Sequence, residues 1–183
     1  MSDLSSPLIE NYFREAGFLD VANIGWGCKL DSKLISAFIE RWRLETHTFN
    51  LSCGERTITL EDMQLQLGLP MDGPVLTGFI QSVDWGAIWY DILCAIPDYI
   101  YGGRIEMDWL RDTLPKLGDD STEVERIRYA WAYILEIIGG YLMPDLSQNL
   151  IHLMWLLKLV DFKAAGKLSW GVCRVGNIVP RDV

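Results

Sequence analysis

The residues best suited to chemistry lie between Glu45 and Gly73, a stretch that holds a histidine, a cysteine and several carboxylates. His47 and Cys53 are the candidates for a base and a nucleophile, and a cysteine nucleophile needs its base within hydrogen-bonding distance. On one extended strand, residue steps of ~3.3 Å would place the two side chains roughly 20 Å apart. The spacing therefore argues against a Cys–His pair. It favours His47 and Cys53 as the two ends of a hairpin strand, with Cys53 in the turn before Gly54.

The other polar residues form no recognisable pattern for a metal or a nucleotide. The two histidines, His47 and His152, are far apart, and the cysteines lack the paired spacing of metal ligands. No glycine-rich phosphate-binding motif occurs. Glu61 and Asp62 open an expected helix, where negative charge suits the helix dipole. We therefore predict no catalytic residue, no cofactor and no metal ligand. An enzyme whose site is assembled from distant residues, such as Cys53 with His152, stays open as the alternative.

The chain is acidic, with a formal net charge of −9 and a sequence pI near 4.6. Proteins that bind nucleic acids on their own usually carry a basic face, because neutralising phosphates supplies much of their affinity. Basic residues here are scattered singly or in short groups, such as Arg41 and Arg43. We therefore expect no direct binding to nucleic acid.

The N-terminal residues lack the basic and apolar segments of a signal peptide. We therefore expect an intracellular protein in which the four cysteines, Cys28, Cys53, Cys94 and Cys173, are reduced thiols. The most apolar run, residues 149–160, is interrupted by two polar side chains and falls short of the about 20 residues that cross a membrane. It predicts a buried helix, and no membrane association.

Hydrophobic periodicity predicts a mainly α domain with a small antiparallel β element, a hairpin or three short strands, near residues 47–78. The β element is expected because β-branched and aromatic residues alternate on both sides of Gly54. The expected helices cover residues 7–16, 31–42, a short segment at 60–67, 82–96, a short segment from residue 108, 122–138 and 147–162.

Residues that cap or end helices stand at many of the expected boundaries. Two pairs resemble capping boxes, in which each partner bonds to the backbone of the other. The starts carry Ser6, Asp31, Thr59 with Asp62, and Thr122 with Glu125; the ends carry Gly17, Gly68 with Pro70, and Gly139 with Gly140.

Arg41 and Arg43 lie at the expected end of a helix, where a positive charge suits the helix dipole. The alternative is pairing across the hairpin with a carboxylate, which would hold the helix against the sheet. The candidate carboxylates are those of Glu45, Glu55 and Glu61. We favour this structural role, because pairs of this kind specify geometry more reliably than they add stability.

Residues 30–78 closely resemble the signature of the plant mobile domain family, which includes maintenance-of-meristems-like and transposon-derived proteins. The blocks "ERWRLETHTF", "GERTITLED" and "LGLPMDGPVLTG" occur in order, and "WLRDTL", "RYAWAYILEIIGGYLMPD" and "LSWG" extend the resemblance to about residues 8–171. Asn50 stands where the family more often has histidine. We assign structural roles to the signature residues, which are Glu40, Arg41, Trp42, Arg43, Glu45, Thr46, His47, Thr48, Phe49, Gly54, Glu55, Thr57, Thr59, Asp62, Gly68, Pro70, Gly73 and Gly78.

The resemblance implies a nuclear protein linked to transposon silencing, genome integrity and meristem maintenance, with phosphatase-like protein partners. The family is sometimes labelled aminotransferase-like. A pyridoxal-phosphate enzyme needs a Schiff-base lysine and a phosphate cradle, and no lysine here lies in such a setting. We therefore expect a non-catalytic nuclear module that binds proteins. The alternatives are an enzyme using cysteine or pyridoxal-phosphate chemistry, and a chromatin- or nucleic-acid-associated domain of a transposon-derived protein.

The resemblance also implies a longer domain, because the family's "SWG" block normally leads into a further helical region. We therefore expect residues 1–183 to form one incomplete, C-terminally truncated domain with a divergent tail at 172–183. If the missing part packs on Trp155, Leu156 and Trp170, an exposed apolar patch is expected there.

Overall fold

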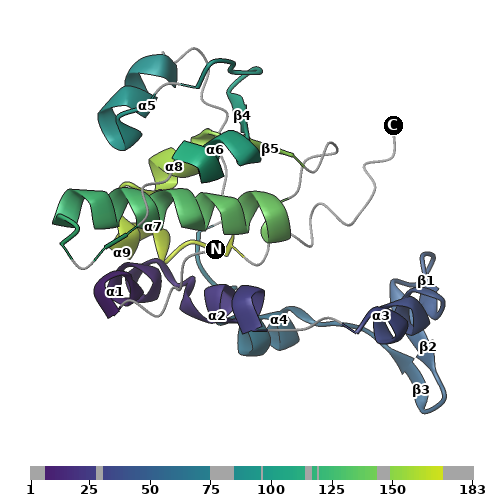
Figure 1. Ribbon diagram of the computed structural model, residues 1–183. Coiled ribbons are helices and arrows are strands. Elements are labelled where there is room, and N and C mark those ends of the chain that lie inside the picture. Colours follow the sequence, from purple (N-terminus) through teal and green to yellow (C-terminus); the bar gives the residue numbers. More distant parts are fainter. Residues whose placement is uncertain are drawn as a thin grey trace.

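The computed structural model describes residues 7–27, 31–74, 85–95, 97–113, 117–118, 120–143 and 149–170. Within these residues the chain is mainly helical and carries two small antiparallel sheets (Figure 1). The predicted class, mainly α with a small antiparallel β element, is therefore confirmed. No helix in the described ranges is long and apolar enough to span a membrane.

Helix α7, Glu123–Ile137, runs through the middle of the main body (Figure 1). It packs against α1 (Pro7–Ala16), α6 (Met107–Thr113) and α8 (Met154–Leu159), and α1 in turn packs against α9 (Phe162–Ala165). The predicted helix starts at residues 7 and 108 are thus confirmed within one residue. The body is a set of short helices gathered around one longer one.

The core of this body is centred on Trp170, which is fully buried. Its ring packs edge-on against Phe18 at 5.2 Å and against Trp155 at 5.9 Å, and its Nε1 donates to the carbonyl of Ala165 at 2.8 Å. Leu156 is fully buried as well. The expected apolar patch is therefore wrong for Leu156 and Trp170, which the body itself covers, while Trp155 is partly buried and packs on Trp170.

A second sheet joins β4 (Arg104–Glu106) to β5 (Leu150–His152), with Ile105 opposite Ile151. This sheet was not predicted from the sequence. One helix was expected over 147–162, whereas the described part of that range holds β5, α8 and the start of α9 at Phe162. Ile105 and Ile151 are both buried, so the pairing places two apolar side chains in the core that a continuous helix would position differently.

The α-helical part of the long helix ends at Ile137, within one residue of the expected end, but Gly139 and Gly140 do not stop the helix. It continues as the π-helical segment η1, Ile138–Leu142. A side chain at Gly139 would place its Cβ 3.0 Å from Cδ1 of Ile151. Glycine is therefore needed here for close packing of β5, and not for ending a helix.

The first sheet has the order β1 (Trp42–Arg43), β2 (Thr48–Leu51), β3 (Gly54–Arg56). Helix α3, Ser32–Ile39, precedes it and is capped by Asp31 as predicted. We call residues 31–59 the protruding lobe, because they extend to one side of the main body (Figure 1).

One prediction about this lobe needs correction. Trp42 was expected on the apolar face of a helix that reached residue 42, but the helix ends at Ile39 and Trp42 lies in β1, opposite Phe49. The third strand that was expected after the hairpin falls on residues outside the described ranges, as do Gly78, Ser6, Cys28, Cys173 and the tail at 172–183.

The lobe is connected to the body through α4, Leu60–Leu67, which packs against α2, Leu19–Gly27. The predicted capping box of Thr59 and Asp62 starts α4, and Gly68, with φ +65°, ends it. The remaining helix, α5 (Trp85–Leu93), ends before Pro97, as predicted.

The chain after α4 is held by the C-terminal end of the body. The hydroxyl of Ser169 donates to the carbonyls of Met71 at 3.2 Å and of Gly73, and the backbone N–H of Ser169 donates to the carbonyl of Pro74 at 3.3 Å. Ser169 is itself buried. The signature blocks "LGLPMDG" and "LSWG" thus meet in space, far apart as they are in sequence.

Gly73→Ala should destabilise the fold by about 1–3 kcal/mol, because its Cβ would clash with the backbone carbonyl of Lys167. Urea unfolding measures the change. Gly118→Ala is the matched control, since a Cβ there meets nothing within 4 Å and the free energy of unfolding should change by less than ~0.5 kcal/mol. Equal stabilities for the two variants would contradict the close approach.

Candidate functional site

The described signature residues lie mainly in two places, with Asp62 of α4 between them. Those from Glu40 to Thr59 lie in the protruding lobe, and Gly68, Pro70 and Gly73 lie in the segment after α4, which Ser169 holds at its end. The first group is exposed or partly buried, whereas the second adjoins the core through the buried Leu69. The signature therefore builds both a surface and the support beneath it.

Three aromatic rings connect α3 to the sheet in the lobe. Phe38 of α3 packs edge-on against Phe49 of β2 at 5.4 Å, and Phe49 packs against Trp42 of β1 at 4.8 Å. The ring of His47 lies 6.2 Å from that of Trp42. All four side chains remain partly or largely exposed. These contacts hold the lobe in shape without burying its apolar surface.

The turn between β1 and β2 is shaped by His47 and its threonine neighbours. His47 has φ +53°, a left-handed conformation that is uncommon outside glycine. Its carbonyl accepts a bond from the hydroxyl of Thr57 at 3.1 Å, and the hydroxyls of Thr46 and Thr48 are 2.7 Å apart. The signature threonines and His47 therefore act together in setting the path of the backbone.

The structure does not bring together the residues that were considered for catalysis. His47 precedes β2 and Cys53 follows it, so the two lie at opposite ends of the strand. His152 lies in β5 of the main body, where its Nδ1 accepts a bond from the backbone N–H of Met154 at 3.2 Å. Among the described residues no group of three or more His, Cys, Asp or Glu side chains could hold a metal ion.

The structure shows the first role considered for the lobe arginines at Arg41, whereas the pair of Arg43 with Glu55 joins β1 to β3 within the sheet and does not hold the helix against it. The Nη1 of Arg41 donates to the carbonyl of Ala37 at 2.8 Å, at the C-terminal end of α3. Arg43 pairs with Glu55 across the sheet at 3.5 Å, and both side chains are about half exposed. Exposed pairs of this kind contribute little to stability, so their main effect is on the charge of the lobe surface.

The lobe exposes much of its apolar surface. None of its residues is buried, and none of the hydrophobic side chains that pack against the core in the described structure comes from it. Ile39, Leu44 and Ile58 are 68%, 63% and 60% exposed. The exposed large apolar side chains of the lobe are Leu34, Ile35, Phe38, Ile39, Leu44 and Ile58.

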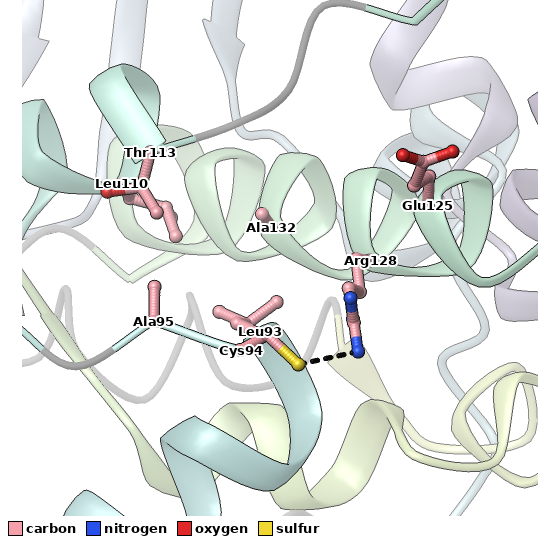
Figure 2. A pocket seen from close by; sticks show the side chains of 8 residues that line it. All are labelled: Leu93, Cys94, Ala95, Leu110, Thr113, Glu125, Arg128 and Ala132. Atoms are coloured by element: carbon pink, nitrogen blue, oxygen red, sulfur yellow. Dashed lines mark hydrogen bonds between the residues drawn. The ribbon is translucent and has the colours of Figure 1, made fainter. Parts of the chain in front are cut away.

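A separate cavity of about 310 Å³ lies in the main body, between the end of α5, α6 and α7 (Figure 2). Leu93, Cys94 and Ala95 face Leu110 and Thr113 across it, as Figure 2 shows. Its remaining lining comes from Glu125, Arg128 and Ala132 of α7. This cavity could not be predicted from the sequence, because its lining comes from the turn after α5 and from one face of α7, which no local sequence pattern connects.

Arg128 provides the positive charge of this cavity. Its Nε donates to the carbonyl of Ile92 at 3.2 Å, and its Nη2 donates to the sulfur of Cys94 at 2.8 Å (Figure 2). Cys94 has φ +54° and an exposed thiol. The guanidinium is therefore held in place by a carbonyl and a sulfur, of which the sulfur is a weak acceptor.

The fold and these surfaces define a mainly helical domain with an uncovered lobe, in which His47, Cys53 and His152 lie apart. A model of the plant mobile domain family matches residues 17–178. The chain belongs to the plant mobile domain family.

The chain is similar to several proteins of Arabidopsis thaliana. It is 37% identical over 167 residues to "Serine/threonine-protein phosphatase 7 long form homolog", an alignment that covers 90% of this chain and 12% of that protein. It is 37% identical over 144 residues to "Protein MAIN-LIKE 2", an alignment that covers 78% of this chain and 21% of that protein. It is 31% identical over 182 residues to "Protein MAINTENANCE OF MERISTEMS", an alignment that covers 92% of this chain and 38% of that protein. The chain thus spans well under half the length of these relatives, and no solved structure matches it.

Glu125, which borders the cavity, gives a prediction about pH. Hydrogen bonds from the backbone N–H and the hydroxyl of Thr122 hold the pKa of the Glu125 carboxyl below its ordinary value. A lowered pKa in the folded state stabilises the fold above the ordinary glutamate pKa, and this contribution disappears as pH falls through the lowered value. Glu125→Gln should therefore lose less stability than the unchanged chain on acidification, as measured by urea unfolding.

Glu123→Gln is the matched control, because Glu123 lies in the same helical turn but is not the capping-box residue. On acidification the free energy of unfolding of this variant should fall by an amount closer to that of the unchanged chain than to that of Glu125→Gln. Identical acid profiles for Glu125→Gln and the unchanged chain would contradict the role of the capping box.

Proposed function

We propose that this chain is a non-catalytic protein-interaction module that acts in the nucleus and binds its partner through the protruding lobe. The observation that supports this most is the exposure of Ile39, Leu44 and Ile58 in a lobe without a buried residue. Contiguous apolar surface that is rimmed by polar groups is typical of protein-binding sites. Burying one such side chain fully contributes about 1.5–3 kcal/mol, so a partner that covers several of them gains substantial affinity.

The composition of the lobe also suits a protein partner. Aromatic residues and arginine are enriched in protein interfaces, and charged residues surround rather than fill their centres. In the lobe the rings of Trp42 and Phe49 contact each other at a tilt. The charged side chains of Arg41, Arg43 and Glu55 belong to the same lobe. Because the ring contacts already hold α3 against the sheet, a partner would meet a largely preformed surface.

The proposed partner is a phosphatase-like nuclear protein. This rests on the family and on the name of one relative, "Serine/threonine-protein phosphatase 7 long form homolog", which refers to a protein phosphatase. The nuclear location is carried over from the family resemblance in the same way. The acidic net charge of −9 favours a protein partner over nucleic acid.

The two other interpretations have weaker support. An enzyme that uses Cys53 with His152 would need the lobe and β5 to come together, and they lie in separate parts of the molecule (Figure 1). Direct nucleic-acid binding would need a basic face on an acidic chain. Retention of the purified chain on DNA at ~150 mM salt would favour that interpretation instead.

The test is capture from nuclear extract followed by reconstitution. The full chain is used to isolate a partner, which is identified by mass spectrometry, purified and titrated against variants of the lobe. Ile39→Glu and Leu44→Glu should each weaken binding at least about tenfold, since a central apolar contact contributes more than ~1.4 kcal/mol.

Val124→Glu and Val160→Glu are the matched controls, because both valines are 52% exposed and lie outside the lobe. Binding to the controls should stay within about twofold of the unchanged chain. A purified partner that binds all four variants equally would show that the lobe is not the binding surface. If no captured protein binds the purified chain on reconstitution, the proposal that the chain is a protein-interaction module would be contradicted.

A further inference from the structure

The cavity beside α7 holds a cation, Arg128, that forms no ion pair with a carboxylate in the described part of the chain, although its charge acts on the nearby Glu125. No ion pair joins Arg128 to an acidic side chain there, and its two hydrogen bonds go to the carbonyl of Ile92 and the sulfur of Cys94. Glu125 also borders the cavity, but its carboxylate bonds to Thr122, and Figure 2 shows its side chain turned away from Cys94.

This arrangement prepares the guanidinium for an anion. The hydrogen bond from Nε to the carbonyl of Ile92 fixes the plane of the guanidinium group. The hydrogen bond from Nη2 goes to the sulfur of Cys94, a weak acceptor that a carboxylate oxygen would displace. Arginine binds carboxylates through two parallel charge-assisted hydrogen bonds, and a group already held in place loses less freedom on binding. A ligand oxygen can therefore replace the sulfur as an acceptor without rearranging Arg128.

The rest of the cavity is suited to a small apolar body. Leu93, Ala95, Leu110 and Ala132 contribute apolar lining, and Thr113 adds one hydroxyl. The volume of about 310 Å³ lies at the lower end of the range for ligand sites. It corresponds to roughly ten groups the size of a water molecule, so the occupant must be small.

We propose that this cavity is a binding site for a small monocarboxylate with a branched or aromatic apolar body, whose carboxylate pairs with Arg128. The cavity lies on the main body and does not include any residue of the protruding lobe, so this site goes beyond the proposed function and does not depend on it. Cys94 lies on the wall of the cavity and provides a reporter for its occupancy.

The experiment measures alkylation of cysteines in the full chain by iodoacetamide, resolved by peptide mass spectrometry. The probe is 4-methylpentanoate, and its neutral amide is the matched ligand control. The acid should slow alkylation of Cys94 in a saturable way and leave Cys53 unchanged, because Cys53 is an exposed thiol in the lobe. The amide should protect Cys94 at least about tenfold less well, since it cannot form the charge-assisted pair.

Arg128→Gln should abolish the preference for the acid, whereas Arg14→Gln, an exposed arginine of α1, should retain it. If Arg128→Gln does not fold, Ala95→Phe provides a second variant: it fills the cavity, and saturation-transfer NMR should then show no binding of the probe. Equal protection by acid and amide, protection of Cys53 together with Cys94, or probe binding that survives both variants would overturn the proposal.

Discussion

The protruding lobe cannot enclose a core of its own, and this constraint explains more of the molecule than any other. Its helix has eight residues and its strands have two, four and three, so too few side chains are available to cover one another. The ring of Phe49 contacts that of Phe38 edge-on and that of Trp42 at a tilt, but none of the three side chains is buried. The apolar side chains that would form a core in a larger unit therefore remain on the surface.

The main body supplies the rigidity that the lobe lacks. Trp170 is buried between Phe18 and Trp155, and the adjacent Ser169 holds the backbone of residues 71–74. The segment that follows α4 is thus fixed to the buried core of the body. This links the two halves of the family signature: one half forms an exposed surface, and the other joins that surface to a stable support.

Features that depend on neighbouring residues could be predicted from the sequence. The capping residue Asp31 and the two capping boxes at Thr59 and Thr122 are local hydrogen-bonding patterns, and the hairpin around Gly54 follows from the alternation of β-branched and aromatic residues on both sides of a turn.

Features that depend on distant contacts could not be predicted from the sequence. Strands β4 and β5 have three residues each and pair across a long stretch of chain, so β4 was not predicted and the residues of β5 were expected in a helix. The glycines at 139 and 140 were taken for a helix end, because the approach of Ile151 is visible only in three dimensions. The cavity at Arg128 was missed for the same reason.

Amide hydrogen exchange on the isolated chain tests the central claim most directly, because it reports the stability of each segment separately. If the lobe has no core of its own, the backbone amides of β2 and β3 open by local unfolding and exchange at least about a hundredfold faster than those in the middle of α7, which open only with the whole fold. Protection of β2 and β3 equal to that of α7 would contradict the account, because it would mean that the lobe is stable without a covering partner.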